Sequence, residues 1–328
     1  MRTRAERYEL ITKFSNDPNV YATLQPELEY FDTEDGFLAF RRSFLRPVVL
    51  GDPVCPKEKL PGFLKEFHET WPYAVFAYVS EDFAKSLHEC ELGYRFCPFS
   101  TERILDLNEP TWLERKKIKG AFKKAKKAKL QLMDVDFDSV SPDIKRMLTE
   151  VNQEFVERTP AKAEVTFISR AVELRNQQGV RTMALSCVEK GEKRDFGFIV
   201  LDPYFFEGKQ LGFQLNAIRF RRTKIWGVYF SIVAMLAETL AQEGYTRLSL
   251  GGCAFDLLDE PSPFPHDGKM LDRLAWIRER ADDYYVLSHF TEMKQELGGK
   301  ALRRYFAISQ SASVTRTIVR FLRVSAMI

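Results

Sequence analysis

Apolar and polar residues in the first third of the chain follow the periods of strands and helices in turn. The stretch "GFLAFRRSFLRPVVLGDPV" (residues 36–54) holds two apolar runs around a basic turn, which predicts a β-hairpin ending near Gly51. The pattern then predicts a helix over residues 57–70 and a strand over 73–80. A short helix that runs through Cys90 and a strand over 94–107 are predicted next.

The second half of the chain alternates in the same way. Ser141 and Pro142 are typical of a helix N-cap and first turn, so a helix is predicted within residues 141–159. The pattern next predicts two strands around a turn at Gly191, within residues 180–202, and a third strand over 211–220. A long helix over 226–244 and a buried strand over 245–250 follow. This order predicts an α/β fold whose two halves meet near residue 130.

Positive charge is concentrated in one segment at that junction. Between Leu113 and Leu130 lie nine Lys or Arg residues and one acid, a net +8 in a chain whose formal net charge is +3. Apolar residues recur in the segment at helical spacing: Ile118, Ala121, Phe122, Ala125 and Ala128. The spacing predicts a helix that docks through a narrow apolar stripe and presents a cationic face. Three interpretations fit that face: it contacts tRNA phosphates, it contacts an anionic membrane, or it is simply solvated.

The loop "RFRRTKIWG" (residues 219–227) lies between a predicted strand and the start of a predicted helix. Exposed N–H groups and the helix dipole favour an anion at such a position. Arg219, Arg221, Arg222 and Lys224 would strengthen the attraction. A solvated turn is the alternative interpretation.

Composition narrows the protein class. A chain of 328 residues that is 45% apolar can bury a full core, in two domains or one large one. Its apolar runs fall short of the ~20 residues of a membrane span, and "MRTRAERYEL" has no apolar signal core, which predicts a cytosolic protein. Five dispersed cysteines without a CxxC predict reduced thiols and no metal site. The sequence has no GxSxG, HExxH, dinucleotide fingerprint or phosphate loop.

Several segments carry a resemblance to a known family. They are "VVLGDPV", "ELGYRFCPFSTERILDLN" before the Lys-rich helix, "LNAIRFRRTKIWGV", "LSLGGCAFD" and "MKQELGGKALRRYF". Together they resemble the cytosolic catalytic region of lysylphosphatidylglycerol synthases and their soluble relatives, over nearly the whole chain. The resemblance implies two tandem GNAT-like acyltransferase domains, related to Fem-type aminoacyltransferases and joined by the basic helix. We expect an N-terminal domain over residues 1–130, ending in that helix, and a C-terminal catalytic domain over 131–328.

The resemblance also implies a reaction: an aminoacyl group passes from aminoacyl-tRNA to a lipid hydroxyl or another nucleophile. An aminoacyl ester is already activated, so the protein must mainly orient the reactants and stabilise an oxyanion. The family's acidic residue three positions before Arg219 is Asn216 here. A neutral amide can bind an ammonium group through its carbonyl oxygen but supplies no charge, so lysine as the transferred amino acid is not supported.

Site residues follow from the same matches. The predicted catalytic residues are Asn216, Arg219 and the terminal pair Arg304 and Tyr305. The predicted substrate-binding residues are Arg222, Lys224, Asp256 and Lys300. Asp202, Glu207 and Asp256 are acidic alternatives for holding the donor amino acid. The resemblance favours tRNA as the partner of the basic helix, through Lys116, Lys119, Lys123, Lys124 and Lys127.

No cofactor or metal is expected. We expect a cytoplasmic protein that contacts an anionic membrane peripherally at its inner face. The tail "SVTRTIVRFLRVSAMI" (residues 313–328) has the composition of an interfacial helix, or of a terminal helix packed on the second domain. Two other functions remain open: an acyl-CoA-dependent N-acyltransferase, with the 219–227 loop on the pyrophosphate, and a non-catalytic module that binds tRNA or a membrane.

Overall fold

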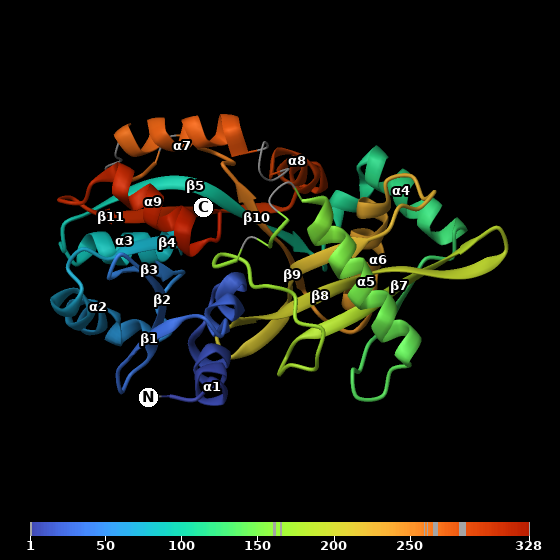
Figure 1. The fold of residues 1–328 in the computed structure, drawn as a ribbon, viewed down its shortest axis with the longest axis horizontal. Helices are drawn as coiled ribbons and strands as arrows, with labels where there is room; N and C mark the ends of the chain where they lie inside the picture. Colours follow the sequence, from blue (N-terminus) through green and yellow to red (C-terminus); the bar gives the residue numbers. More distant parts are fainter. Residues whose placement is uncertain are drawn as a thin grey trace.

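A computed structural model describes residues 2–159, 162–164, 166–258, 260, 262–264, 268–281 and 287–327. Within these ranges the chain forms one eleven-stranded sheet, in the order β1-β2-β3-β4-β11-β5-β10-β9-β8-β7-β6, with helices packed against it (Figure 1). None of the helices in these ranges is long and apolar enough to cross a membrane.

The strands are β1 (Glu29–Asp32), β2 (Phe37–Ser43), β3 (Arg46–Leu50), β4 (Val75–Ser80), β5 (Tyr94–Asp106), β6 (Gln131–Asp134), β7 (Arg181–Glu189), β8 (Glu192–Phe206), β9 (Lys209–Phe220), β10 (Arg247–Ala254) and β11 (Lys300–Ser309). The α-helices are α1 (Arg4–Phe14), α2 (Leu60–Thr70), α3 (Glu81–Glu89), α4 (Lys116–Lys127), α5 (Pro142–Arg158), α6 (Val228–Gln242), α7 (Gly268–Ala281), α8 (Leu287–Leu297) and α9 (Val314–Val324). Short 3₁₀ helices are η1 (Pro18–Leu24), η2 (Lys57–Lys59) and η3 (Thr111–Glu114).

The elements predicted from the pattern are present. The predicted hairpin is β2 and β3, with Ser43 paired to Arg46 across the turn. The helix predicted from Ser141 is α5, and the Ser141 hydroxyl accepts a hydrogen bond from the Ile144 N–H at 3.4 Å. The two strands around Gly191 are β7 and β8, in antiparallel register.

The sheet is continuous across both halves of the chain. Strand β11, from the C-terminal end, lies between β4 and β5 and pairs antiparallel with both. Strand β10 joins the halves because it pairs antiparallel with β5 and parallel with β9. The expected domain boundary at residue 130 falls between α4 and β6, and it stays a prediction.

Alternation along the strands sends side chains to two cores in the first half. On β4, Val75 and Ala77 pack with the residues of α7 and α9, whereas Phe76 and Val79 pack with those of α2 and α3. In the second half, one face of β7 to β10 packs against α4 and α6, and α5 packs against the other face. The centre of the sheet is therefore enclosed on both faces, as the pattern of an α/β fold requires.

The basic segment forms α4 and docks as predicted. Ile118, Ala121 and Ala125 are fully buried, and Phe122 and Ala128 pack against the same core. The Ser231 hydroxyl of α6 donates to the Ala121 carbonyl at 2.9 Å. In Figure 1, α4 lies beside α6 at the end of the molecule far from α9.

The C-terminal tail is a docked helix that packs on elements from both halves of the chain. Helix α9 buries Ile318 and Val324 in the core that it shares with β2, β3 and α7, and the Arg41 guanidinium donates to the Val324 carbonyl. The Phe321 ring lies 4.8 Å from the Phe306 ring, centroid to centroid. Its apolar side chains therefore cover the face of the sheet formed by β11 and its neighbours.

Candidate active site

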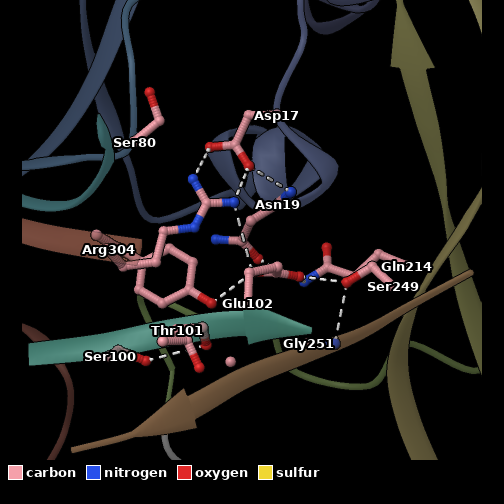
Figure 2. A network of polar contacts seen from close by, with 12 residues as sticks. Asp17, Asn19, Ser80, Ser100, Thr101, Glu102, Gln214, Ser249, Gly251 and Arg304 are labelled. Atoms are coloured by element: carbon pink, nitrogen blue, oxygen red, sulfur yellow. Dashed lines mark hydrogen bonds and ion pairs between the residues drawn. The ribbon is translucent and has the colours of Figure 1, made fainter. Parts of the chain in front are cut away.

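A buried network of charged and polar side chains lies at the centre of the sheet (Figure 2). Arg304 on β11 is 1% exposed and donates to both carboxylate oxygens of Asp17, at 2.6 and 3.1 Å. The same guanidinium lies 3.6 Å from Oε2 of Glu102 on β5. Burial disfavours its charge, but the carboxylates of Asp17 and Glu102 outweigh burial and raise the pKa of Arg304.

Glu102 is the acceptor at the middle of this network. It is fully buried and accepts hydrogen bonds from the Tyr78 hydroxyl, the Ser249 hydroxyl and, at 3.4 Å, the Gln214 amide. Several donors around one buried carboxylate compensate for its lost hydration. The network therefore ties β4, β5, β9, β10 and β11 together at one point.

Tyr78 adopts a conformation unusual for a strand residue. Its φ of 64° is left-handed, and its side chain is 1% exposed. The ring lies under the Arg304 guanidinium at 4.9 Å, and a Cβ at Gly252 would come within 2.6 Å of the hydroxyl. Backbone strain of this kind costs of order 1–3 kcal/mol and persists only where the surroundings impose it. Burial, with a further contribution from Glu102, raises the pKa of Tyr78 well above its usual value.

Asp52 extends the network toward the end of β4. Its carboxylate accepts from the Ser80 N–H at 2.8 Å and the Ser80 hydroxyl at 2.6 Å. Burial, followed by the negative charge of Asp17, raises the pKa of Asp52 to about 7. Asp52 thus holds a proton in the folded protein under conditions where a solvated aspartate has lost it.

We expect Asp52→Asn to change how stability depends on pH. The folded protein keeps a proton on Asp52 that the unfolded chain has released, so this group lowers the free energy of unfolding as pH rises from about 4 to about 7. The contribution is at most about 1.4 kcal/mol per pH unit and is flat outside that window. Urea unfolding at a series of pH values should show that the free energy of unfolding falls less steeply with pH in the variant than in the wild type. Parallel curves of this free energy against pH would contradict the raised pKa of Asp52.

An apolar cavity of about 470 Å³ lies beside this network. Its floor includes Tyr78, Gln214 and the backbone of Gly251 and Gly252. Its walls are mostly apolar side chains of α7, α9 and neighbouring strands: Phe99, Leu274, Ile277, Phe306, Ile318, Phe321 and Leu322. Trp276 also lines the cavity and is 52% exposed, so the cavity reaches the surface at α7.

A second cavity of about 500 Å³, called the polar cavity below, is lined by more charged side chains than the first. Its lining includes charged and hydroxyl side chains: Arg158, Thr159, Glu164, Arg170, Arg219 and Tyr229. Five residues line both cavities: Ser169, Leu215, Asn216, Leu287 and Lys294. The two cavities therefore adjoin, and Asn216 and Lys294 supply polar side chains at the junction.

Lys294, on α8, is the cation at this junction. Its ammonium donates to the Gly252 carbonyl at 2.8 Å. A Cβ at Gly251 would lie 3.5 Å from the Lys294 nitrogen, an ordinary contact distance, so Lys294 packs directly over this part of β10. A fixed ammonium between two cavities is suited to stabilising negative charge that develops where two substrates meet.

Asn216 and Arg219, predicted from the sequence, are brought together on β9 beside the polar cavity. Arg219 is 6% exposed, and its guanidinium donates to Glu164 at 2.8 Å and also to Asn152. The Asn216 amide nitrogen is buried and has no hydrogen-bond partner among the residues that the structure describes. Asn216 therefore has an unused donor at the junction of the cavities.

The structure does not bring the other predicted site residues to the cavities. Arg304 lies behind the cavity floor, and the Tyr305 hydroxyl donates to Glu81 at 3.1 Å within the core of α2 and α3. Asp256 accepts from Thr101, Arg103 and Gln295, and it lines neither of the two cavities. Arg222, Lys224 and Lys300 are exposed and line neither cavity.

The remaining acidic alternatives are likewise occupied or distant. Asp202 is fully buried, and its carboxylate accepts hydrogen bonds from the Arg170 guanidinium with donor–acceptor distances of 2.5 to 2.9 Å. Glu207 lies in the exposed turn between β8 and β9. In the described part of the chain, no three His, Cys, Asp or Glu side chains are grouped to hold a metal ion.

The loop predicted to bind an anion already contains ion pairs. Arg221 lies 2.7 Å from both Glu150 and Glu154 of α5, and Arg219 is paired with Glu164. Carboxylates of this chain thus neutralise two of the loop's four cations. An anion at the start of α6 stays a prediction that rests on Arg222 and Lys224.

The cationic face of α4 is solvent-exposed. Lys119 pairs with Glu114 at 2.6 Å, and Lys126 pairs with Glu238 at 3.0 Å. Four of the five lysines predicted to bind tRNA have no ion pair with any described residue: Lys116, Lys123, Lys124 and Lys127. This face therefore carries uncompensated positive charge.

The chain is similar to known proteins both in its sequence profile and in its fold. The profile of the family described as "Phosphatidylglycerol lysyltransferase, C-terminal" matches residues 10–307. No curated protein sequence matches the chain. The structure of L-PGS from Bacillus licheniformis is similar, with a TM-score of 0.76 and 16% identity, covering 98% of this chain and 96% of that one.

Two further solved structures are similar. One is the C-terminal domain of an Agrobacterium fabrum protein described as a lysylphosphatidylglycerol synthetase, with a TM-score of 0.76, 18% identity and coverage of 99% of each chain. The other is FemX, with a TM-score of 0.54, 11% identity and coverage of 94% of this chain and 96% of that one. At these identities the likeness shows the fold, and the predicted α/β, tandem GNAT-like fold class is confirmed.

Proposed function

This chain belongs to the family of the C-terminal region of phosphatidylglycerol lysyltransferases, as the sequence predicted, and we propose that it transfers an aminoacyl group from aminoacyl-tRNA to a phospholipid hydroxyl. Family membership implies aminoacyl transfer. The tRNA donor and the lipid acceptor are the parts that we propose, with the enzyme in the cytoplasm and its acceptor at the inner face of the membrane.

The observation that carries the proposal is the pair of adjoining cavities. The apolar cavity, walled by α9 and α7, suits the glycerol and upper acyl chains of a lipid. The polar cavity, with Arg219, Glu164 and Tyr229, suits the aminoacyl end of a charged tRNA. A donor in one cavity and an acceptor in the other would meet at Asn216 and Lys294, which line both.

At that junction the chemistry needs few protein groups. The acceptor hydroxyl oxygen bonds to the carbonyl carbon of the aminoacyl ester, and the ester bond to the terminal ribose of the tRNA then breaks. The acceptor's proton ends on the released ribose oxygen, so atoms and charge balance. The Lys294 ammonium is placed to stabilise the oxyanion of the intermediate, and the free amide donor of Asn216 can hold the donor in register.

Asn216 also bears on the choice of amino acid. It stands where the family has an acidic residue, and Glu164, the one carboxylate among the described residues that line the polar cavity, is paired with Arg219. A cationic side chain would therefore find little uncompensated negative charge there. We propose that the transferred amino acid has a neutral side chain.

The exposed face of α4 supports tRNA as the donor. Its unpaired lysines can neutralise phosphates while the apolar stripe holds the helix on α6. Such contacts position a nucleic acid without reading its sequence. The helix would then serve all tRNAs alike, leaving selection of the amino acid to the polar cavity.

We expect the triple variant Lys123→Glu, Lys124→Glu, Lys127→Glu to fold normally and to bind tRNA weakly. These positions avoid the buried stripe, so the core is unchanged. The slope of log affinity against log salt should shrink by roughly one unit for each lost phosphate contact. Fluorescence titrations with several tRNAs at a series of salt concentrations would measure both quantities.

A control with the same change in net charge reverses Lys57, Lys65 and Lys85, which are exposed on η2, α2 and α3. We expect that variant to keep the wild-type salt slope. If the α4 triple variant binds with the affinity and slope of the wild type, α4 does not contact tRNA. Loss of vesicle binding in that variant would assign the helix to the membrane.

Binding measurements separate the proposed donor from acyl-coenzyme A. We expect charged tRNA to bind and to protect residues of the polar cavity from labelling, and coenzyme A to do neither. Tight binding of coenzyme A with no binding of tRNA would reverse the assignment of donor.

A further inference from the structure

The turn between β2 and β3 carries two large apolar residues in full solvent. Phe44 is 61% exposed and Leu45 is 81% exposed. They are the two central residues of a two-residue hairpin loop, with φ angles of 50° and 62°. Loops of this geometry favour Asn-Gly or Asp-Gly, because a side chain disfavours the left-handed region.

Two other hairpins in the described chain follow that preference. The turn between β7 and β8 is Lys190-Gly191, and the turn between β8 and β9 is Glu207-Gly208, with positive φ at all four residues. The β2–β3 turn therefore departs from the sequence rule that the same protein obeys elsewhere. Its residues lack the glycine that the backbone favours, and they also expose apolar surface to solvent. Such a combination is typical of a functional position.

Positive charge surrounds this tip. The Arg323 guanidinium of α9 lies 4.1 Å from the Phe44 ring centre, and that of Arg46 lies 4.5 Å from the ring of Tyr73, which is 45% exposed. Partial burial, followed by the positive charges of Arg46 and Arg316, lowers the pKa of Arg320. None of these four arginines forms an ion pair with a described residue, and the Arg320 Nε is buried without a hydrogen-bond partner among them.

We propose that the β2–β3 tip and the arginine face of α9 form a docking surface for an anionic phospholipid bilayer. Phe44 and Leu45 would insert among the lipid chains, Tyr73 would lie at the headgroup level, and Arg46, Arg316, Arg320 and Arg323 would contact lipid phosphates. An aliphatic and an aromatic side chain projecting from a rigid hairpin fit an acyl layer. A nucleic acid fits less well, because it offers Leu45 no apolar partner.

The position of α9 gives the surface its role. One face of this helix carries the arginines, and the other, through Ile318, Phe321 and Leu322, lines the apolar cavity. Docking would therefore hold the acceptor cavity against the bilayer that contains its lipid. This role rests on the proposed function, whereas the docking itself does not.

The test is the double variant Phe44→Asn, Leu45→Gly, which gives the turn the residues that its backbone favours. We expect it to bind phosphatidylglycerol vesicles at least about tenfold more weakly than the wild type in co-sedimentation, and to melt at the same or a higher temperature. A purely structural role for the turn predicts the reverse: a lower melting temperature with unchanged vesicle binding. Phe206→Ser, at a 40% exposed aromatic beside the β8–β9 turn, is the matched control and should bind as the wild type does.

Two comparisons separate this proposal from others. Wild-type protein that fails to bind phosphatidylglycerol vesicles, or a double variant that binds them as well as the wild type, overturns it. A double variant that loses tRNA affinity instead assigns the surface to nucleic acid and also overturns it. In transfer assays the variant should lose activity toward vesicle lipid but keep activity toward short-chain lipid in detergent. If no lipid accepts the group, the proposed function fails, and the vesicle measurement still decides the docking surface.

Discussion

Replacing Lys294 with Met is expected to lower the rate of transfer by about two to three orders of magnitude while leaving tRNA binding nearly unchanged. Lys294 lines both cavities and is held by the Gly252 carbonyl at 2.8 Å. Removing one preorganised donor to a developing oxyanion costs about 3–4 kcal/mol in the transition state. Single-turnover rates at saturating donor would measure the loss directly, since they separate chemistry from binding.

Lys300→Met is the informative comparison. The sequence favours Lys300 as a substrate-binding residue, but that side chain is exposed at the start of β11 and lines neither cavity. We expect its replacement to cost far less than that of Lys294. A folded Lys294→Met variant with the turnover of the wild type would remove Lys294 from the reaction.

Arg304→Met is expected to destabilise the protein by about 3–5 kcal/mol. The variant leaves two buried carboxylates, Asp17 and Glu102, without the cation that lies between them. Uncompensated buried charge carries a large desolvation cost. Arg304 also lowers the pKa of Asp52, so its loss favours the protonated form of that carboxyl, and the variant should lose less stability at pH 5 than at pH 8. Urea unfolding at both pH values would measure the loss.

The neighbouring arginine supplies the control. Arg303 lies 3.2 Å from Glu260 in a partly exposed pair and also hydrogen-bonds with Tyr305. Partly exposed pairs are worth far less than buried ones, so Arg303→Met should cost clearly less stability than Arg304→Met. If the two variants lost equal stability, Arg304 would not be the centre of a buried charge network.

Much of the fold could be predicted from local pattern. Hydrophobic periodicity and turn or cap residues were sufficient to predict three elements without knowledge of their packing. These are the hairpin within residues 36–54, the capped helix at Ser141 and the helix α4 with its apolar stripe. The order of strands in the sheet could not be predicted in this way. Strand β11 lies between β4 and β5, a pairing that joins segments about 200 residues apart, and no local pattern encodes it.

Sequence motifs place residues together beside the cavities only where one strand carries them. Asn216 and Arg219 share β9, so a sequence motif could find both. Lys294 lies in the matched segment "MKQELGGKALRRYF", but its place at the cavities depends on how α8 packs against β10. Asp17, Tyr78 and Glu102 come from three distant elements, and only Tyr78 lies inside an apolar run of the sequence, "VFAYVS".

The docked tail shows a related limit. The composition of residues 313–328 fits both an interfacial helix and a packed one, because arginines and apolar residues alternate there. In the structure Ile318 and Val324 are buried, while Arg316 and Arg323 remain exposed, so one face of the helix is packed and the other is free to contact solvent. Sequence alone could not supply the Phe44 and Leu45 tip that lies against those arginines.

The most direct measurement of the central claim is transfer itself. Purified protein would be incubated with a mixture of labelled aminoacyl-tRNAs and vesicles of total lipid extract, and the label would be partitioned into organic solvent. We predict that label becomes lipid-soluble with the wild-type protein, and that Lys294→Met reduces its rate of appearance by about two to three orders of magnitude. Label that stays entirely on tRNA or appears only as free amino acid, in the presence of folded wild-type protein, would contradict the account.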